Sequence, residues 1–385
     1  TIFCIYVIYN KLLLSSSRIV NKKIKIYIFS PFSFIGGDTL SISRLIKNLN
    51  PKIYDISFIC LKKTKITYYL KKKNFKIIKI NSERALFSIG KIRRIIKNDL
   101  KKKFDKYIFI SNQNYANIIS VLLLHKLSKI KLILIERNHI DEFKYQKTFK
   151  NFIIKILIKY FYKRANIIIG ISKVLSKDLS NYIKKKVITI YNPSFDKQVY
   201  NLSKNHVKIK NKKNLILTVG RFENQKDPYT ILKAFKIVLK KIDCNLMMIG
   251  YGSMFNELKE FIKNNGIQNK VQIQNNISNP YPYYKYSKLF VLASKYEGFG
   301  NVIVEAAMFK LPIISSNCNS GPPEILLNGK GGDLFKVGDF LSLSKMIIKN
   351  LKVKNKKKTT YLFKSLKRFD IKNHSKKYEE IFAKI

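Results

Sequence analysis

The chain has 385 residues, of which 46% are hydrophobic, and it carries a formal net charge of +53. This length allows two domains with separate cores, and the hydrophobic fraction excludes an intrinsically disordered chain. Such a charge favours a nucleic acid or an anionic membrane as partner. Because an AT-rich coding sequence also produces abundant lysine, isoleucine and asparagine, we attribute most of the charge to composition.

The four cysteines lie far apart, without a CxxC pair and without a histidine at metal-ligand spacing. We therefore expect isolated thiols in a reducing compartment and no metal site. No segment reaches about 18 uninterrupted apolar residues, so we predict no transmembrane helix. Residues 1–20 begin with an apolar stretch that Asn10 and Lys11 interrupt, and we assign them no part in the fold.

Short β-branched runs alternate with longer helical patterns in the first half of the chain. The runs that are apolar on both faces predict buried parallel strands at residues 24–30, 54–60, 106–111, 131–136, 166–172 and 187–192. Helical patterns between them include residues 38–49, 86–98, 113–127 and 145–164. This order indicates a doubly wound α/β domain, which we place at residues 21–195.

A polar, lysine-rich segment at residues 196–213 predicts a linker to a second domain at residues 214–368. Strand patterns resume there, at residues 215–220, 244–250, 271–274, 288–294 and 311–316. Residues 369–385 have a helical pattern and are expected to cross back toward the first domain. The predicted fold is therefore two facing Rossmann-like domains with a deep cleft between their strand ends.

The first chemical motif is LILTVGRFENQKDPYTILKAF at residues 215–235. A turn after the strand carries Arg221 and Lys226, and Asp227 is predicted to cap a helix that begins with Pro228. Two cations beside a helix N-terminus form an anion site that suits a diphosphate. The alternative is that two of the many basic residues lie on a loop without a function.

The second motif is SKYEGFGNVIVEAAMFKLPIISS at residues 294–316. Glu297 precedes the glycine turn of residues 298–300, and Asn301 is predicted to cap the helix that carries Glu305. The glycines would let backbone amides approach a ligand closely, and the two carboxylates could accept hydrogen bonds from sugar hydroxyls. The spacing of the glutamates alone is weak evidence, and the glycine turn between them strengthens it.

Four short motifs of the second half occur in a characteristic order. They are GRFENQKDP (220–228), IGYGSMFNEL (249–258), EGFGNVIVE (297–305) and GPPEIL (321–326). With FSFIGGDTLSISRLIKNL (32–49), YKRANIIIGISKVLSKDL (162–179) and ITIYNPSFD (188–196), this set resembles glycosyltransferase family 4, which has the GT-B fold. The resemblance implies a retaining hexosyltransferase that uses a nucleotide-diphosphate sugar, for which we expect a UDP-sugar. It implies no cofactor and no bound metal.

The resemblance also implies roles for individual residues. Arg221 and Lys226 would hold the diphosphate, Glu297 the donor sugar and Glu305 the ribose. It adds further residues to the donor site: Gly36, Gly37, Gly250, Ile277, Gly298, Phe299, Gly300, Asn301 and Val302. Near the end of a first-domain strand, either His139 approaches the donor sugar as a catalytic group or Asn138 takes that place. A solvent-exposed loop histidine is the third alternative for His139.

The expected acceptor is a lipid-linked or polysaccharide molecule of cell-envelope glycan synthesis, bound by the first domain at the cytoplasmic face of the plasma membrane. Basic clusters at residues 71–73 and 101–103 could contact anionic lipid. Two other classes of protein are alternatives. A GT-B nucleotide-sugar epimerase would lack the paired glutamates. A nucleic-acid-binding protein would explain the charge and the 23 tyrosines, but no RNA-binding motif occurs and the tyrosines are scattered, so we expect no nucleic-acid partner.

Overall fold

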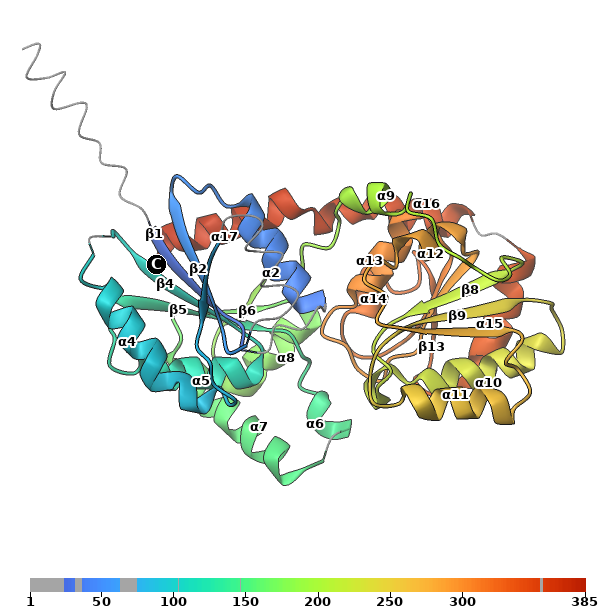
Figure 1. The fold of residues 1–385 in the computed structure, drawn as a ribbon, viewed down its shortest axis with the longest axis horizontal. Coiled ribbons are helices and arrows are strands. Elements are labelled where there is room, and N and C mark those ends of the chain that lie inside the picture. Colours follow the sequence, from blue (N-terminus) through green and yellow to red (C-terminus); the bar gives the residue numbers. More distant parts are fainter. Residues whose placement is uncertain (1–23, 32–36, 63–74, 103, 146, 354–355) are drawn as a thin grey trace, which may run out of the picture.

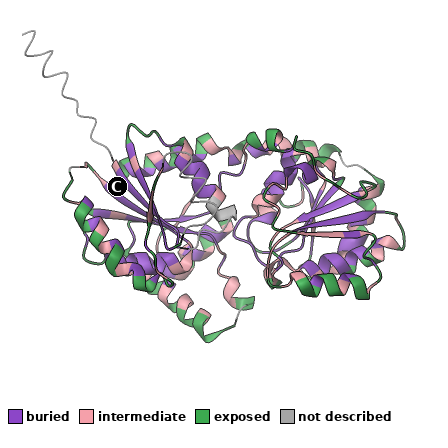
Figure 2. Ribbon diagram, in the orientation of Figure 1, coloured by how far each residue is buried: buried purple, intermediate pink, exposed green. Residues whose placement is uncertain are grey.

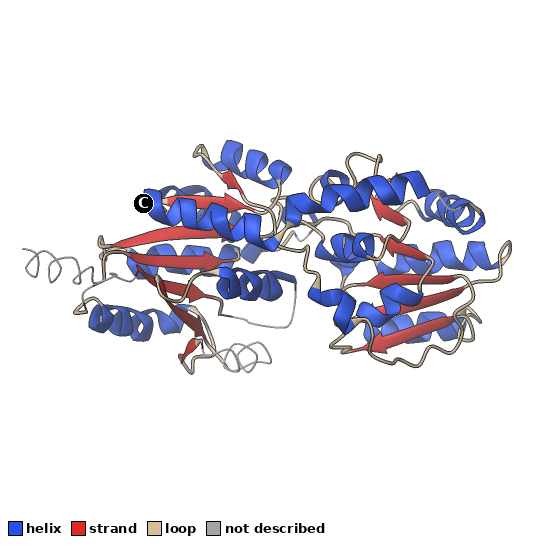
Figure 3. Ribbon diagram, turned by 90° about the horizontal axis from the view of Figure 1, so that it is seen from above, coloured by secondary structure: helices blue, strands red, loops and turns tan. Residues whose placement is uncertain are grey.

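The computed structural model describes residues 24–31, 37–62, 75–102, 104–145, 147–353 and 356–385. Two parallel sheets lie side by side, each flanked by helices (Figures 1 and 3). The α/β class with doubly wound sheets that the sequence predicts is therefore confirmed. Residues 1–20, Gly36 and the basic cluster at residues 71–73 lie outside the described residues.

The first sheet has seven parallel strands in the order β3-β2-β1-β4-β5-β6-β7. Their bounds are β1 (Ile24–Phe29), β2 (Tyr54–Cys60), β3 (Lys76–Lys79), β4 (Tyr107–Asn112), β5 (Ile130–Glu136), β6 (Ile167–Gly170) and β7 (Ile188–Thr189). The helices and 3-10 turns of this half are α2 (Gly37–Asn48), η1 (Leu86–Ser88), α4 (Ile89–Asp99), α5 (Asn114–Leu124), α6 (Glu142–Tyr145), α7 (Phe149–Phe161), η2 (Tyr162–Arg164) and α8 (Lys173–Ile183).

The second sheet has six parallel strands in the order β10-β9-β8-β11-β12-β13. Their bounds are β8 (Leu215–Val219), β9 (Asn245–Gly250), β10 (Val271–Asn275), β11 (Leu289–Leu292), β12 (Ile313–Ser316) and β13 (Asp333–Phe335). The helices and 3-10 turns from residue 198 onward are α9 (Gln198–Leu202), η3 (Asn224–Lys226), α10 (Pro228–Leu239), α11 (Phe255–Asn264), α12 (Tyr281–Tyr286), α13 (Asn301–Met308), α14 (Pro322–Ile325), α15 (Phe340–Lys352), α16 (Lys356–Ser365), η4 (Leu366–Phe369) and α17 (Ile371–Lys384).

The central strands are buried on both faces, which explains why they appear in the sequence as continuous apolar runs (Figure 2). The sequence analysis missed two short edge strands. In β3 the two isoleucines stand between exposed lysines, and β13 has only three residues, so neither gives a strong apolar run. The segment expected to be a linker contains the short helix α9, which packs against α12.

The helix predicted at residues 145–164 is divided in the structure. Thr148 has an extended backbone, and its hydroxyl accepts a hydrogen bond from the amide of Asn151 at 3.2 Å, so a new helix begins at Phe149. The preceding turn, α6, is therefore separate from α7.

The last helix, α17, returns to the first half of the chain and packs against α2 (Figure 1). The ring of Phe382 lies 5.7 Å from that of Tyr54, and the ammonium group of Lys106 donates to the carbonyl oxygen of Ala383 at 2.8 Å. Among the described residues, no helix has both the length and the hydropathy that crossing a bilayer requires.

Candidate functional site

The two sequence motifs meet at the middle of the second sheet. The strands β8 and β11 are hydrogen-bonded neighbours, and the strand order reverses between them. In open α/β sheets such a switch point binds ligands at the carboxyl ends of the strands. The turn with Arg221 and Lys226 follows β8, and Glu297 follows β11. The topology therefore brings both motifs to one place.

The loop after β8 ends in a well-formed helix cap. Asp227 adopts a left-handed conformation with φ of 46°, and its side chain accepts from the amide of Thr230 at 3.4 Å and from its hydroxyl at 2.7 Å. Pro228 is the first residue of α10. The predicted cap is confirmed, and it holds Lys226 directly before the N-terminus of a 12-residue helix.

Lys226 and Glu297 form a hydrogen-bonded ion pair between the two loops. The side chains are only 18% and 7% exposed, and Glu297 Oε1 also accepts from the Ser294 hydroxyl at 2.7 Å. Burial removes most of the water around both charges, and the pairing together with the Ser294 hydrogen bond replaces part of that lost hydration. The pair is thus a preformed polar centre.

Arg221 lies beside this pair but is exposed. Its guanidinium donates to Gln225 Oε1 at 2.6 Å, and the Gln225 amide donates to the backbone oxygen of Tyr296 at 3.0 Å. Arg221 is therefore tied to the residue that precedes Glu297. Three of the four charged residues that the sequence singled out come together here.

The fourth, Glu305, lies on the buried side of α13. Its carboxylate accepts a hydrogen bond from the Tyr284 hydroxyl at 3.2 Å. Burial raises the pKa of Glu305, while the charge of Arg44 from the first domain acts in the opposite direction. Glu305 thus faces Tyr284 and Arg44, not the Lys226–Glu297 pair.

The predicted cap at Asn301 is wrong by one residue. Gly300 is the cap of α13, with φ of 102°, a left-handed conformation that a residue with a side chain rarely adopts. Asn301 is the first residue of the helix, and its side-chain oxygen accepts from the Ser194 hydroxyl at 2.8 Å and from the Asn192 amide at 3.2 Å. The side chain of Asn301 therefore joins the helix to the first half of the chain.

Gly298 lies directly against the first domain. A Cβ atom at this position would be 1.7 Å from the backbone oxygen of Arg137, which follows β5 in the first domain. Only glycine fits there without moving one of the domains. Phe299 is buried and packs against the rings of Tyr191 and Phe369, with ring centres 5.9 and 5.1 Å away.

The remaining predicted donor-site residues that the structure describes lie on four different segments. Gly250 ends β9, and a Cβ atom there would be 1.9 Å from the backbone oxygen of Gly220, so its visible role is close packing of neighbouring strand ends. Ile277 and Val302 are half-buried and pack against the core. Gly37 is the first residue of α2.

His139 is buried, which rules out the solvent-exposed alternative. It is 2% exposed, and its Nδ1 accepts from the amide of Asp141 at 3.2 Å. Nε2 lies 3.0 Å from a carboxylate oxygen of Asp178. Both ring nitrogens are bound within the first domain, and Asn138 is the more exposed of the two candidates.

Several contacts between the domains were not predicted from the sequence. Asp141, next to the histidine, accepts from the Asn319 side chain. Glu324 in the GPPEIL motif accepts from the amide of Lys173, at the start of α8, at 3.0 Å. The motif singles out Glu324, but its partner lies 151 residues away in the chain, so only the tertiary structure reveals the contact.

Aromatic stacking adds to this interface. The ring of Tyr145 on α6 stacks on that of Tyr296, with centres 5.5 Å apart and an interplanar angle of 17°. The hydroxyls of Ser172 and Ser320 lie 2.8 Å apart across the same boundary. Where the sequence predicts a deep cleft, the two domains are thus in direct contact at these positions.

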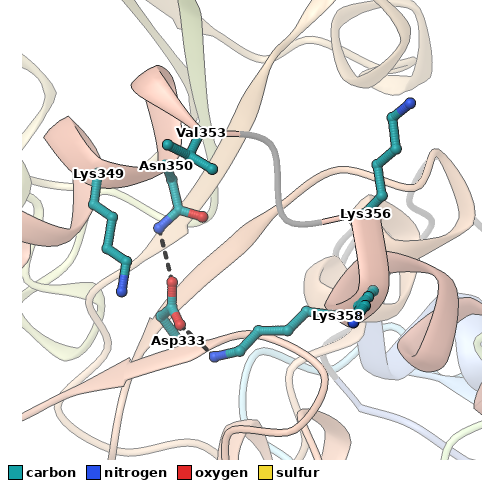
Figure 4. A pocket seen from close by; sticks show the side chains of 7 residues that line it. Asp333, Lys349, Asn350, Val353, Lys356 and Lys358 are labelled. Carbon is teal, nitrogen blue, oxygen red and sulfur yellow. Dashed lines mark hydrogen bonds and ion pairs between the residues drawn. The ribbon is translucent and has the colours of Figure 1, made fainter.

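A pocket on the second domain lies away from this region (Figure 4). It lies at Asp333, where β13 begins, and is lined by lysines of α15 and α16. Lys358 and Asn350 bind the two carboxylate oxygens of Asp333 at 2.6 and 2.7 Å. Since it opens at the amino end of a strand, it is at the opposite edge of the sheet from the switch point.

The described residues hold no group of three or more His, Cys, Asp or Glu side chains placed to share a metal ion.

The sequence of this chain is similar to those of known glycosyltransferases. The model of the family described as glycosyl transferases group 1 matches residues 200–363. An uncharacterized glycosyltransferase of Methanocaldococcus jannaschii is 34% identical over 66% of this chain and 62% of its own length. A Campylobacter jejuni relative, N-acetylgalactosamine-N,N'-diacetylbacillosaminyl-diphospho-undecaprenol 4-alpha-N-acetylgalactosaminyltransferase, is 26% identical over 60% of this chain and 62% of its own length. The chain thus spans less than two thirds of each of these relatives.

The fold is similar to that of solved structures over nearly the whole chain. The crystal structure of Anabaena HepE in complex with UDP and glucose has a TM-score of 0.78 and covers 94% of this chain and 100% of its own. Because the two sequences are only 16% identical, this similarity bears on the fold alone. The fold is the GT-B fold that the sequence resemblance implies.

Proposed function

We propose that the chain, whose residues 200–363 match the model of the glycosyl transferases group 1 family, is a glycosyltransferase of envelope glycan synthesis. It moves a hexose or N-acetylhexosamine from a UDP-sugar to a lipid-linked or polysaccharide acceptor, with retention of configuration. The UDP bound in HepE supports the choice of nucleotide. The lipid diphosphate in the name of the Campylobacter relative supports a lipid-linked acceptor.

One observation carries the proposal, the meeting of Arg221, Lys226 and Glu297 at the switch point of the second sheet. The two cations and the N-terminus of α10 provide positive potential for a diphosphate. Glu297 would accept hydrogen bonds from hydroxyls of the transferred sugar. Glu305, deeper in the fold, would accept from the ribose and exchange its bond to Tyr284 for that contact.

The proposed reaction needs neither a metal nor another cofactor. The bond between the anomeric carbon and the β-phosphate oxygen breaks, and a bond from that carbon to the acceptor oxygen forms on the same face. The acceptor's proton passes to the departing phosphate oxygen. Charge accumulates on the diphosphate as it leaves, and Arg221, Lys226 and the amides of α10 stabilise it electrostatically.

Calorimetric titration with UDP tests the assignment directly. Each charge-assisted hydrogen bond contributes about 1.5–3 kcal/mol, so Arg221→Ala combined with Lys226→Ala should weaken UDP binding by about 100-fold or more. The matched control removes two exposed lysines of α15, Lys345→Ala with Lys352→Ala. Unchanged UDP affinity in the first variant refutes the diphosphate site.

The Lys226 change leaves Glu297 buried without its cation, so folding is checked separately. Arg221→Ala alone, at an exposed position, should still lower the affinity by about tenfold. Glu305→Gln should weaken UDP more than pyrophosphate, because only UDP has a ribose. Equal losses for the two ligands would contradict the role given to Glu305.

A further inference from the structure

Exposed apolar side chains gather on α7, which extends along the lower edge of the first domain in Figure 1. Nearly half of the exposed large hydrophobic side chains among the described residues lie between Tyr145 and Tyr160. The five on α7 are 39–80% exposed: Phe149, Phe152, Ile153, Ile156 and Tyr160. Such a group differs from apolar residues scattered singly over a surface, and it marks a contact site.

These five side chains share one side of the helix, which we call the outer face of α7. At about 100° per residue, they fall within an arc of about 100°. The opposite side holds α7 on the domain, where Ile158 is buried and the helix packs against α5 and α8. The Tyr182 hydroxyl of α8 donates to the backbone oxygen of Lys155 at 2.9 Å. Within the described chain the fold therefore does not use the outer face.

The charge around the outer face has one sign. The sequence of α7, FKNFIIKILIKYF, contains three lysines and no acidic residue. Lys150 lies about 100° from Phe149 on one side of the arc, and Lys159 lies about 80° away on the other side. Lys163 and Arg164 follow directly in η2. A phenylalanine-rich face with lysines at its borders is the pattern of helices that lie in the interface of an anionic bilayer.

We propose that the outer face of α7 docks on a bilayer containing anionic phospholipid. Phe149, Phe152 and Ile156 enter the boundary between headgroups and acyl chains, and Lys150 and Lys159 meet the lipid phosphates. The docking rests on the proposed function for its purpose, since it would bring the enzyme to a lipid-linked acceptor. The lipid binding itself can be measured without donor or acceptor. A bilayer supplies both an apolar layer and a negative surface along the full length of the helix, which matches the outer face in both respects.

The position of α7 connects this surface with the candidate site. It begins four residues after Tyr145, whose ring stacks on Tyr296, the neighbour of Glu297. A bilayer in contact with α7 would therefore lie next to the boundary between the two domains. An acceptor held in that bilayer could reach the site while its lipid tail stayed among the acyl chains.

Vesicle flotation with the full chain, without donor or acceptor, tests the proposal. The wild-type chain should float with vesicles of equal parts phosphatidylglycerol and phosphatidylcholine, and much less with phosphatidylcholine alone. Phe149→Ser with Phe152→Ser should lower the partition coefficient about tenfold or more, since each buried aromatic ring contributes strongly. The matched control, Leu341→Ser with Tyr361→Ser, removes two similarly exposed apolar side chains of the second domain and should bind as the wild type does.

Charge reversal provides a second, independent measurement. Lys150→Glu with Lys159→Glu should lower binding about tenfold or more, because each lysine near an anionic surface contributes about fivefold. Lys345→Glu with Lys352→Glu changes the net charge equally on α15 and should have little effect. If the α7 variants float like their controls, the proposal is wrong.

Two further readouts separate membrane docking from self-association and from nucleotide binding. Light scattering that finds a wild-type dimer and a monomeric Phe149→Ser, Phe152→Ser variant would make the outer face a contact between copies and overturn the lipid assignment. UDP affinity should be unchanged in every α7 variant. A chain that floats but does not bind UDP would refute the proposed function and leave the membrane contact standing. A chain that binds UDP but does not float would refute the membrane contact and leave the proposed function standing.

Discussion

Glu136 is a buried carboxylic acid that should make the stability of this protein depend on pH. It is the last residue of β5 and is 3% exposed. One oxygen accepts from the amides of Arg137 at 2.8 Å and Asn138 at 3.1 Å, and the other accepts from the Tyr162 hydroxyl at 2.5 Å. Burial outweighs these hydrogen bonds and raises the pKa of Glu136 from 4.5 to about 7.

The direction of the effect follows from which state holds the proton. Between about pH 4.5 and 7, the unfolded chain loses this proton while the folded chain keeps it, so the free energy of unfolding falls as pH rises. Below this range both states are protonated, and above it both are ionised. At about 1.4 kcal/mol per pH unit, the pKa rise corresponds to about 3 kcal/mol of lost stability.

Glu136→Gln should remove this dependence. Urea unfolding of the wild type and the variant is compared at about pH 5 and about pH 8, followed by circular dichroism because the sequence has no tryptophan. The stability of the variant relative to the wild type should increase by about 2–3 kcal/mol from the lower to the higher pH. The free energies of unfolding of the variant and the wild type should also differ by an amount that does not vary with pH. The glutamine amide would present a second donor to the Tyr162 hydroxyl, which already accepts from Asn117 at 2.9 Å.

The control is Glu380→Gln, at an exposed position of α17. Its stability relative to the wild type should not change with pH. If wild type and Glu136→Gln differ by the same amount at both pH values, Glu136 is not a protonated acid in the folded chain, and the assignment of its raised pKa to burial is refuted.

Two more substitutions test the loops of the candidate site. Gly298→Ala places a Cβ atom against the backbone oxygen of Arg137, so small-angle scattering should show a larger radius of gyration and glycosyl transfer should fall; an unchanged radius would contradict the close approach of the domains. Asp227→Ala removes the cap of α10 and leaves alanine in a left-handed conformation, which should lower the free energy of unfolding by about 1–2 kcal/mol. A thermal unfolding curve identical to that of the wild type would count against the cap.

The buried strands could be predicted because a parallel strand covered on both faces must be apolar along its whole length. The edge strands β3 and β13 lack such a run and were missed. The cap of α10 was predictable, since Asp227 and Pro228 act on the residues next to them. The cap of α13 was not, because the Asn301 side chain binds Asn192 and Ser194, which are more than 100 residues away in the chain, and leaves the cap position to Gly300.

The two doubly wound sheets and the placement of Arg221, Lys226 and Glu297 on loops after strands could be predicted from the amino-acid sequence, because those features follow from local periodicity and neighbouring residues. Which side chains meet depends on how the chain folds over long distances. Lys226 pairs with Glu297, His139 with Asp178 and Glu324 with the start of α8, and each contact joins segments far apart in the chain. The tertiary structure also decides which side of α7 stays uncovered, since an apolar helix face has the same sequence pattern whether it packs on a core or faces outward.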